Sequence, residues 1–262
     1  MILEFLITML IVGFVTGGLN IKFDRFFTIL LLLFIFRMNI FDSVNVFLWV
    51  IMLGALMILL NNKDKIAKVP HSKKVKLFIL IPIFTFIASF FGSTAFRIAP
   101  AWLLIATLGV LAILYGLRLM FIHFEEHELK FEKGHPRITK MCGLLGPWIS
   151  GFSVGFIGTS LKPLKIPFAI KVGRMNAKEV YLGNTVTTFF ASAFSIMWHY
   201  FLKDISPAAF YSQMLLGAAL WTGIHYTFEI TNLFFKEKWR KPFQVMIGIF
   251  LLMASVKVFM LL

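Results

Sequence analysis

Cysteine, acidic side chains and long polar stretches are all scarce in this chain. The single cysteine, Cys142, cannot form an internal disulfide or a thiolate metal site, and we expect it to be inert. Asp and Glu number 12 against 26 Lys and Arg, and charged residues make up only 15% of the 262 residues. No phosphate-binding P-loop occurs, which argues against direct driving by ATP. The shortages exclude a disulfide framework and a cysteine-bound metal, and leave no room for a separate soluble domain.

Apolar side chains dominate what remains. Hydrophobic residues make up 59% of the chain, and 32 residues are phenylalanines, more than a soluble core could absorb. Runs near the length of about 20 residues that spans a bilayer recur from end to end. We expect apolar segments at 2–18, 26–36, 43–60, 77–96, 101–121, 143–157, 164–170, 178–201, 207–232 and 242–262. This pattern predicts an all-α integral membrane protein, multi-pass, in a prokaryotic-type inner membrane.

The net charge of +14 comes from lysines and arginines in short loops between the apolar runs. These residues do not line one amphipathic face and no recognition motif accompanies them, so we expect no nucleic-acid partner. Basic loops next to membrane segments are typical of the cytoplasmic side. The loop at 61–76 carries six lysines against one acid, Asp64, and we therefore predict that it is cytoplasmic.

A break in the apolar pattern lies at Gly158-Thr159-Ser160-Leu161-Lys162-Pro163, and a second proline, Pro167, follows four residues later. Proline removes a backbone donor and glycine lets the chain bend, so this stretch predicts an interrupted membrane helix over 158–163. The freed N–H groups of the next short helix and the charge of Lys162 would together attract an anion. The alternative is that the lysine only reaches the headgroups on its long stem. We expect the neighbouring Lys165 to be interfacial.

The plan of the first half recurs in the second. A shift of 140 residues sets Gly18 to Lys22 on Gly158 to Lys162, and a shift of 138 sets Gly13 and Gly17 on Gly151 and Gly155. We predict one membrane domain built from a first repeat, 1–122, a cytoplasmic connecting loop, 123–142, and a second repeat, 143–262. Each repeat contains a re-entrant or broken helical hairpin followed by three transmembrane helices.

Loop charge distinguishes two topologies for the broken pairs. If each pair crosses the membrane, the basic loop 233–241 lies outside when 61–76 lies inside, which violates the positive-inside rule. If each pair turns back, loops 61–76, 122–142, 171–178 and 233–241 are all cytoplasmic. We therefore favour re-entrant hairpins. Three full crossings per half then give the two repeats inverted orientations, with both hairpins meeting near the midplane.

The break resembles the repeat of the sulfite exporter family, TauE/SafE. Gly158, Pro163 and Pro167 match a glycine-rich break followed by a Val-Pro-like step, and Leu182-Gly183-Asn184-Thr185 is similar to the helix opening that follows. The resemblance spans both halves and is closer in the second. It implies a secondary transporter for small anions, usually sulfite or organosulfonates. The sequence departs from the family pattern where Ser160, Leu161 and Lys162 replace glycines, and the first half lacks both prolines.

The candidate substrate-binding residues come from the two breaks and the helix after the second break. They are Lys22, Lys162, Asn20, Gly18, Gly158, Thr159, Ser160, Asn184 and Thr185. Helix capping alone would also explain Asn20, Thr159 and Ser160. His225 and Glu229 are four apart, share a helix face and could relay a proton, although a simple interfacial pair is the alternative.

A second function of another class rests on His123-Phe124-Glu125-Glu126-His127. The spelling matches inverted zinc metalloproteases, in which two histidines bind zinc and a glutamate activates water. The segment opens a loop at the end of a membrane helix, and no catalytic domain surrounds it. We therefore predict a transporter and no enzyme, cofactor or resident metal, with a membrane-embedded zinc hydrolase using His123, Glu126 and His127 as the alternative. The predicted partners are the anionic substrate and membrane lipid, and the sequence is also compatible with proton or ion coupling and with a homodimer.

Overall fold

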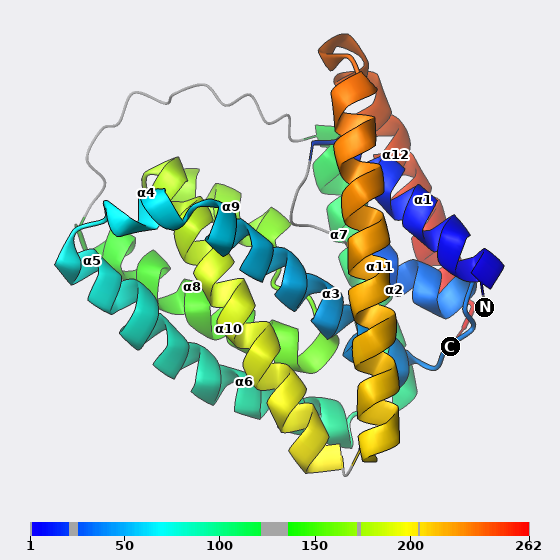
Figure 1. The fold of residues 1–262 in the computed structure, drawn as a ribbon, viewed down its shortest axis with the longest axis horizontal. Helices are drawn as coiled ribbons and strands as arrows, with labels where there is room; N and C mark the ends of the chain where they lie inside the picture. Colours follow the sequence, from blue (N-terminus) through cyan, green and yellow to red (C-terminus); the bar gives the residue numbers. More distant parts are fainter. Residues whose placement is uncertain (1, 21–25, 122–135, 172–173, 204, 262) are drawn as a thin grey trace. The chain divides into compact units, whose positions relative to one another are not determined.

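The computed structural model describes residues 2–20, 26–121, 136–171, 174–203 and 205–261. All regular structure within these ranges is helical, which confirms the all-α prediction (Figure 1). The elements are α1 (Ile2–Gly18), α2 (Phe26–Phe34), α3 (Ile40–Asn61), α4 (Lys63–Ala67), α5 (His71–Val75), the π-helical η1 (Lys76–Leu80), α6 (Ile81–Ile98), α7 (Ala101–Phe121), α8 (Pro136–Ile157), α9 (Lys162–Lys171), α10 (Ala177–Lys203), α11 (Pro207–Phe234) and α12 (Glu237–Phe259).

The helices follow the apolar runs closely. Two of them, α1 and α7, have the predicted bounds, and the others differ mainly by turns added at polar ends. The helix α8 begins at Pro136, so the end of the predicted connecting loop 123–142 is helical. The segment before α6 is helical from His71 onward and includes the π-helical turn η1. A run's apolar length therefore located each helix, whereas its polar extensions could not be read from hydropathy.

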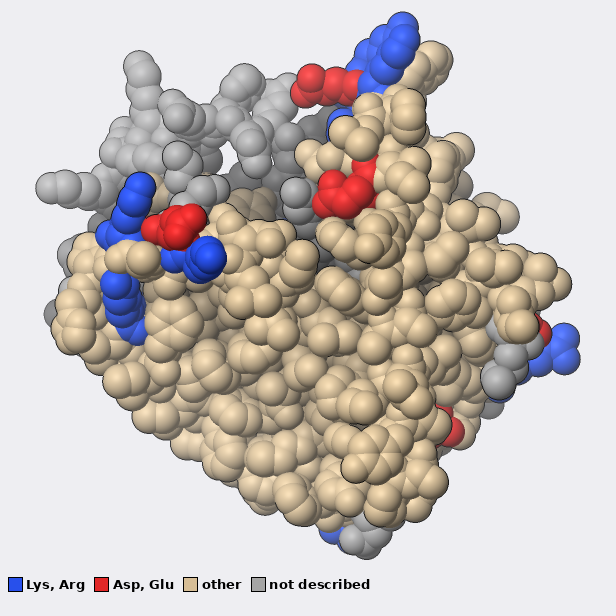
Figure 2. Space-filling view, viewed as in Figure 1, with Lys and Arg blue, Asp and Glu red and all other residues tan. Residues whose placement is uncertain are grey.

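Among the described residues, five helices are long and apolar enough to cross a membrane: α3, α6 with the turns that precede it, α7, α10 and α12. The helix α11 has 28 residues, but its polar content keeps it outside this group. In Figure 2 the charged side chains gather at the margins of the view, and the surface between them is uncharged. These features are those of a multi-pass membrane protein.

The chain divides into two compact units, and each takes segments from both halves of the sequence. Unit 1 contains α1, α2, α7, α12, the beginning of α3 and most of α11. Unit 2 contains α4 to α6, α8 to α10, the rest of α3 and the beginning of α11. Within unit 1, α7 packs against α12, and α1 contacts α2 and α12.

In unit 2 the helices α6, α8 and α10 pack against one another and run parallel (Figure 1). Near their beginnings, Lys73 Nζ lies 2.6 Å from Glu179 Oε1, and a Cβ on Gly183 would lie 3.8 Å from Leu77. Near their ends, His199 Nε2 lies 2.7 Å from the carbonyl oxygen of Gly155, and the His199 ring stacks on Phe96. The three helices therefore begin at one end of the unit and finish at the other.

Small residues allow the close approach of α6 and α8. A Cβ on Gly151 would lie 2.8 Å from the Cβ of Ala88 and 3.0 Å from the carbonyl oxygen of Thr85. A Cβ on Gly155 would lie 2.6 Å from the carbonyl oxygen of Ser89. Contacts between small residues are a common way to pack membrane helices, because the helix backbones can then approach closely.

In unit 1 the helices α1 and α11 approach in the same manner. A Cβ on Gly13 would lie 2.3 Å from the Cβ of Thr227 and 3.1 Å from the carbonyl oxygen of Ile224. A Cβ on Gly17 would lie 2.7 Å from the Cβ of Thr231 and 2.8 Å from the carbonyl oxygen of Phe228. The partners advance along α11 as the glycines advance along α1, so these two helices also run parallel.

The two short helices, α2 and α9, end in the same way. Arg37 follows α2 with a φ of 53°, and Arg174 follows α9 with a φ of 46°. The next N–H in each case reaches back six residues: Met38 donates to Leu32 at 3.1 Å, and Met175 donates to Ala169 at 3.2 Å. Each left-handed residue turns the chain out of its helix and satisfies a carbonyl that the helix end leaves open.

Candidate functional site

The predicted interruption is present, but glycine causes it and the prolines do not. The helix α8 ends at Ile157, Gly158 has a φ of 78° and Leu161 a φ of 50°, and α9 begins at Lys162. Pro163 and Pro167 lie inside the bounds of α9, so the prediction of a break over 158–163 was wrong at its end. Pro163 occupies the first turn of α9, where a helix N–H has no intrahelical acceptor and its absence is harmless.

After the break the chain turns back along α8. The hydroxyl of Ser150 donates to the carbonyl oxygen of Ser160 at 3.3 Å, across ten residues of sequence. The ammonium of Lys165 donates to the same hydroxyl. Residues beyond the break thus lie beside the middle of α8 instead of continuing past its end. This return lets α10 begin at the same end of unit 2 as α8.

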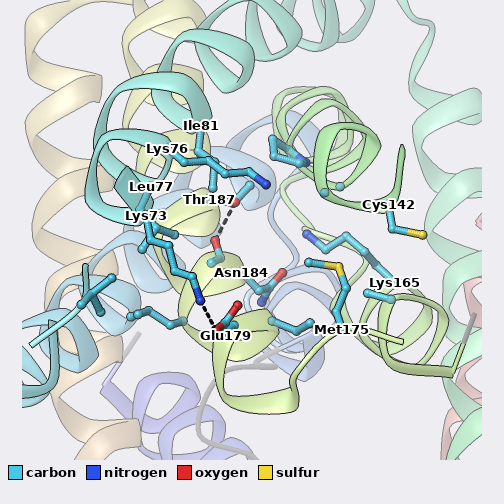
Figure 3. Close-up of a pocket in the computed structure, with 18 of the residues that line it drawn as sticks. Lys73, Lys76, Leu77, Ile81, Cys142, Lys165, Met175, Glu179, Asn184 and Thr187 are labelled. Atoms are coloured by element: carbon cyan, nitrogen blue, oxygen red, sulfur yellow. Dashed lines mark hydrogen bonds and ion pairs between the residues drawn. The ribbon is translucent and has the colours of Figure 1, made fainter. Parts of the chain in front are cut away.

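A cavity of about 270 Å³ lies at that end of unit 2. Its wall is formed by the segment from Val69 to Ile81, which leads through α5 and η1 into α6, by the first half of α8, by the beginning of α10, by α9 and by Met175 (Figure 3). The apolar lining residues are Val69, Pro70, Leu77, Ile81, Pro147, Ala169, Met175, Val180 and Leu182. Cys142 also lines the cavity, so the chain's single thiol lies at the candidate site.

Lysines give the cavity its charge. Lys73, Lys76 and Lys165 all line it, and Figure 3 shows Lys76 and Lys165 directed toward the same space as Asn184. Lys73 is paired with Glu179, at 2.6 Å, so its charge is balanced locally. Among the described residues, neither Lys76 nor Lys165 forms an ion pair. The cavity therefore has a net positive wall.

Asn184 supplies an uncharged polar group to the same cavity. It lies about two turns into α10, and its side chain is only 7% exposed. Within the described part of the chain, its side-chain oxygen has no hydrogen-bond partner. A buried acceptor oxygen without a partner is costly, and the NH2 group of the same amide can donate a hydrogen bond to a ligand. Thr187, one turn later, donates its hydroxyl to the carbonyl of Gly183 at 2.7 Å.

Most of the other second-half residues predicted for the site are buried near the break. Thr159, Ser160 and Lys162 are 5%, 6% and 7% exposed. Lys162 is not among the lining residues of the cavity, whereas Lys165 is. Thr185 is also buried, and its hydroxyl donates to the carbonyl of Tyr181 at 2.9 Å. The structure thus brings Asn184 together with Lys165, which the sequence had suggested to be interfacial.

The first-half candidates are only partly described. Gly18 is buried at the end of α1, where a Cβ would lie 2.5 Å from the ring of Phe243. Asn20 is exposed and has a φ of 53°. Lys22 lies outside the described residues, as do His123, Glu126 and His127 of the zinc alternative.

His225 and Glu229 are half-buried on α11 in unit 1. The ring of His225 stacks on Trp221, with centroids 5.5 Å apart and planes 4° apart. The proton relay suggested by their spacing stays a prediction.

Sequence reasoning missed His199. It is 2% exposed, contacts the carbonyl of Gly155 in the last turn of α8, and lies 4.2 Å from the parallel ring of Phe96. The carbonyls of a helix's last turn have no intrahelical donor, so a side-chain N–H is a suitable partner. A histidine near the end of an apolar run was the only sign of this contact in the sequence.

Comparisons of the chain with protein-family models, with curated proteins and with solved structures find no match.

Proposed function

We propose that the protein is a secondary membrane transporter for a small organic anion, with its binding site in the cavity of unit 2. One observation carries the proposal. Lys165, Lys76 and Asn184 line one mainly apolar cavity, and the described residues include five helices long and apolar enough to cross a membrane. Ionisable groups within membrane proteins are costly and are usually retained for a function. The two ammonium groups and the NH2 group of the Asn184 amide can all donate hydrogen bonds to a carboxylate or sulfonate.

Equivalent contacts in the two units support the internal repeat. Gly13 and Gly151 are 138 residues apart, and their partners Ile224 and Thr85, on α11 and α6, are 139 apart. Gly17 and Gly155 have partners with the same offset. The matching ends of α2 and α9 are 137 apart. Two halves that make the same contacts in the same order are expected of a transporter with internal symmetry.

The return of the chain after Leu161 supports a re-entrant hairpin. Because α8 and α10 run parallel, the segment between them must carry the chain back to the end where α8 began. Loop charge places that end in the cytoplasm, since the lysines of 61–76 lie there. Three crossings then follow each hairpin, which inverts the second repeat. With this topology, the cavity lies at the cytoplasmic end of unit 2.

The apolar lining favours an organosulfonate over a bare oxyanion such as sulfite. Nine of the lining residues are apolar, and the volume of about 270 Å³ exceeds the need of a few oxygen atoms. An apolar body on the anion would remove this lining from water at a gain of roughly 25 cal/mol per Å². Resemblance to the sulfite exporter family, carried by Gly158, Pro163, Pro167 and the 182–185 segment, points to the same substrate class.

Transport by the purified full-length chain tests the proposal. In proteoliposomes we expect counterflow of butanesulfonate, and we expect Lys165→Gln to weaken it by about tenfold or more, because hydrogen bonds to charged groups contribute about 1.5–3 kcal/mol. Lys63→Gln is the matched control, since Lys63 is exposed on α4 and does not line the cavity. Equal rates for both variants would refute the site, and an absence of counterflow for every sulfonate and carboxylate would refute the function.

Cys142 offers a second readout in the unmodified protein. It lines the cavity, so a bound anion should slow its reaction with N-ethylmaleimide. We expect protection by butanesulfonate and none by equimolar chloride. Protection that persists in Lys165→Gln would show that Lys165 is not required for anion binding in the cavity.

A further inference from the structure

The hydroxyl of Ser150 lies between the cavity and the chain break. Ser150 is in the middle of α8 and is fully buried, at 0% exposure. Its oxygen accepts a hydrogen bond from the ammonium of Lys165, which lines the cavity. Its proton is donated to the carbonyl oxygen of Ser160, inside the break, at 3.3 Å. A serine hydroxyl has one donor and two acceptor positions, so it can make both contacts at once.

We propose that Ser150 is a positioning residue that transmits anion binding at Lys165 to the Gly158–Leu161 break. The inference rests on the proposed function, because it assumes that an anion binds in the cavity. It adds a route by which binding changes the conformation of the hairpin, through a residue that does not line the cavity.

The chemistry of the two partners supports this route. An ammonium has three donors, so Lys165 can hold Ser150 and an anion oxygen together, and an anion that draws the ammonium changes its bond to Ser150. The break contains backbone that is sensitive to such a change. Leu161 follows Ser160 directly and has a φ of 50°, a conformation that costs about 1–2 kcal/mol for a residue with a Cβ. The bond from Ser150 fixes the carbonyl beside this strained residue.

Ser153 provides a matched control on the same helix. It is 7% exposed, and its hydroxyl donates to the carbonyl of Ser150 at 3.3 Å, within α8. Ser150→Ala and Ser153→Ala therefore remove the same atom from similarly buried positions. Only the first variant disconnects Lys165 from the break.

The experiment measures binding and backbone protection in the full-length chain. We expect butanesulfonate to change amide hydrogen exchange of residues 159–162 in the wild type and in Ser153→Ala, and to leave it unchanged in Ser150→Ala. We also expect Ser150→Ala to weaken binding about tenfold by calorimetry, because the Ser150 hydroxyl holds the Lys165 ammonium in place before the anion binds, and without it the ammonium must be ordered on binding. In a Lys165→Gln background, Ser150→Ala should have little further effect, because the two residues act through one contact.

Each outcome decides a separate claim. If no sulfonate or carboxylate binds the wild type, the proposed function fails. If butanesulfonate binds but Ser150→Ala behaves as Ser153→Ala does in affinity and exchange, the proposed function stands and the role of Ser150 is refuted. An unchanged exchange rate at residues 159–162 in the wild type would also refute it. Should Ser150→Ala fail to fold, Ser150→Cys keeps the side-chain volume with a weaker donor and is expected to show the same loss of coupling.

Discussion

At the scale of single residues, the packing of α8 against α6 depends on Gly155 having no side chain. A Cβ at this position would lie 2.6 Å from the carbonyl oxygen of Ser89 and 2.9 Å from the backbone nitrogen of Ser93. Neither backbone atom can move without displacing a helix. We expect Gly155→Ala to destabilise the protein by about 1–3 kcal/mol, the usual cost of overpacking, and to lower the melting temperature in detergent. Gly146→Ala is the control, because a Cβ on Gly146 would meet only the flexible stem of Lys165, at 3.9 Å. Equal melting temperatures for the two variants would show that Gly155 is not needed for the close packing of α8 on α6.

Asn184 tests the sign of the charge that the cavity accepts. Asn184→Asp keeps the shape of the side chain and adds a negative charge beside Lys76 and Lys165. We expect anion binding to be lost, because a like charge at close range opposes an anionic ligand in a site shielded from water. The measurement is protection of Cys142 from N-ethylmaleimide by butanesulfonate. The control is Asn62→Asp. Asn62 lies between α3 and α4 and does not line the cavity, so this variant should leave protection intact. Retained protection in Asn184→Asp would rule out this residue as an anion contact.

At the scale of helices, the pair Lys73–Glu179 joins α5 to the first turn of α10 beside the cavity. Both side chains are about half exposed, at 53% and 55%, so the pair itself contributes little to stability. Glu179→Gln leaves the charge of Lys73 unbalanced, and we expect anion affinity to rise about twofold to fivefold by long-range attraction. The rise should diminish at high ionic strength, where charges are screened. The double variant Lys73→Glu with Glu179→Lys keeps the net charge and should have the original affinity. An unchanged anion affinity in Glu179→Gln would show that Glu179 does not offset the positive charge of the cavity.

The sequence predicted helices better than it predicted the site they form. Apolar run length and hydropathy are local properties, and they located α1 and α7 without error. The cavity depends on which helix ends meet, and hydropathy contains no such information. The sequence therefore predicted Lys73 and Lys76 only as part of a basic cytoplasmic loop and Lys165 as interfacial, whereas the structure brings all three to one cavity. Pro163 was misread for a related reason, since proline interrupts a helix interior but is tolerated in a first turn.

At the scale of the whole molecule, the proposed internal repeat rests on glycine spacing that can be read from the sequence. Gly13 and Gly17 are spaced as Gly151 and Gly155 are, and each pair packs on a helix of the opposite half. The sequence could not predict which helix each glycine pair contacts, because the spacing of glycines within one helix does not identify the helix against which they pack. Each compact unit combines helices from both halves of the sequence.

Topology is the property of the whole molecule that the two hairpin interpretations predict differently. With re-entrant hairpins, positions 68 and 174 are both cytoplasmic and position 206 is outside; with crossing pairs, position 174 is outside and position 206 is inside. The 2.6 Å contact of Lys73 with Glu179 favours the first arrangement, since it joins the segments that follow positions 68 and 174. In a Cys142→Ser background we expect a membrane-impermeant maleimide to label Ser206→Cys in intact cells, and to label Lys68→Cys and Arg174→Cys only after permeabilisation. All three residues are exposed, so access to the reagent decides the result. Labelling of Arg174→Cys in intact cells, with Lys68→Cys protected, would establish crossing pairs and remove the basis for two inverted hairpins.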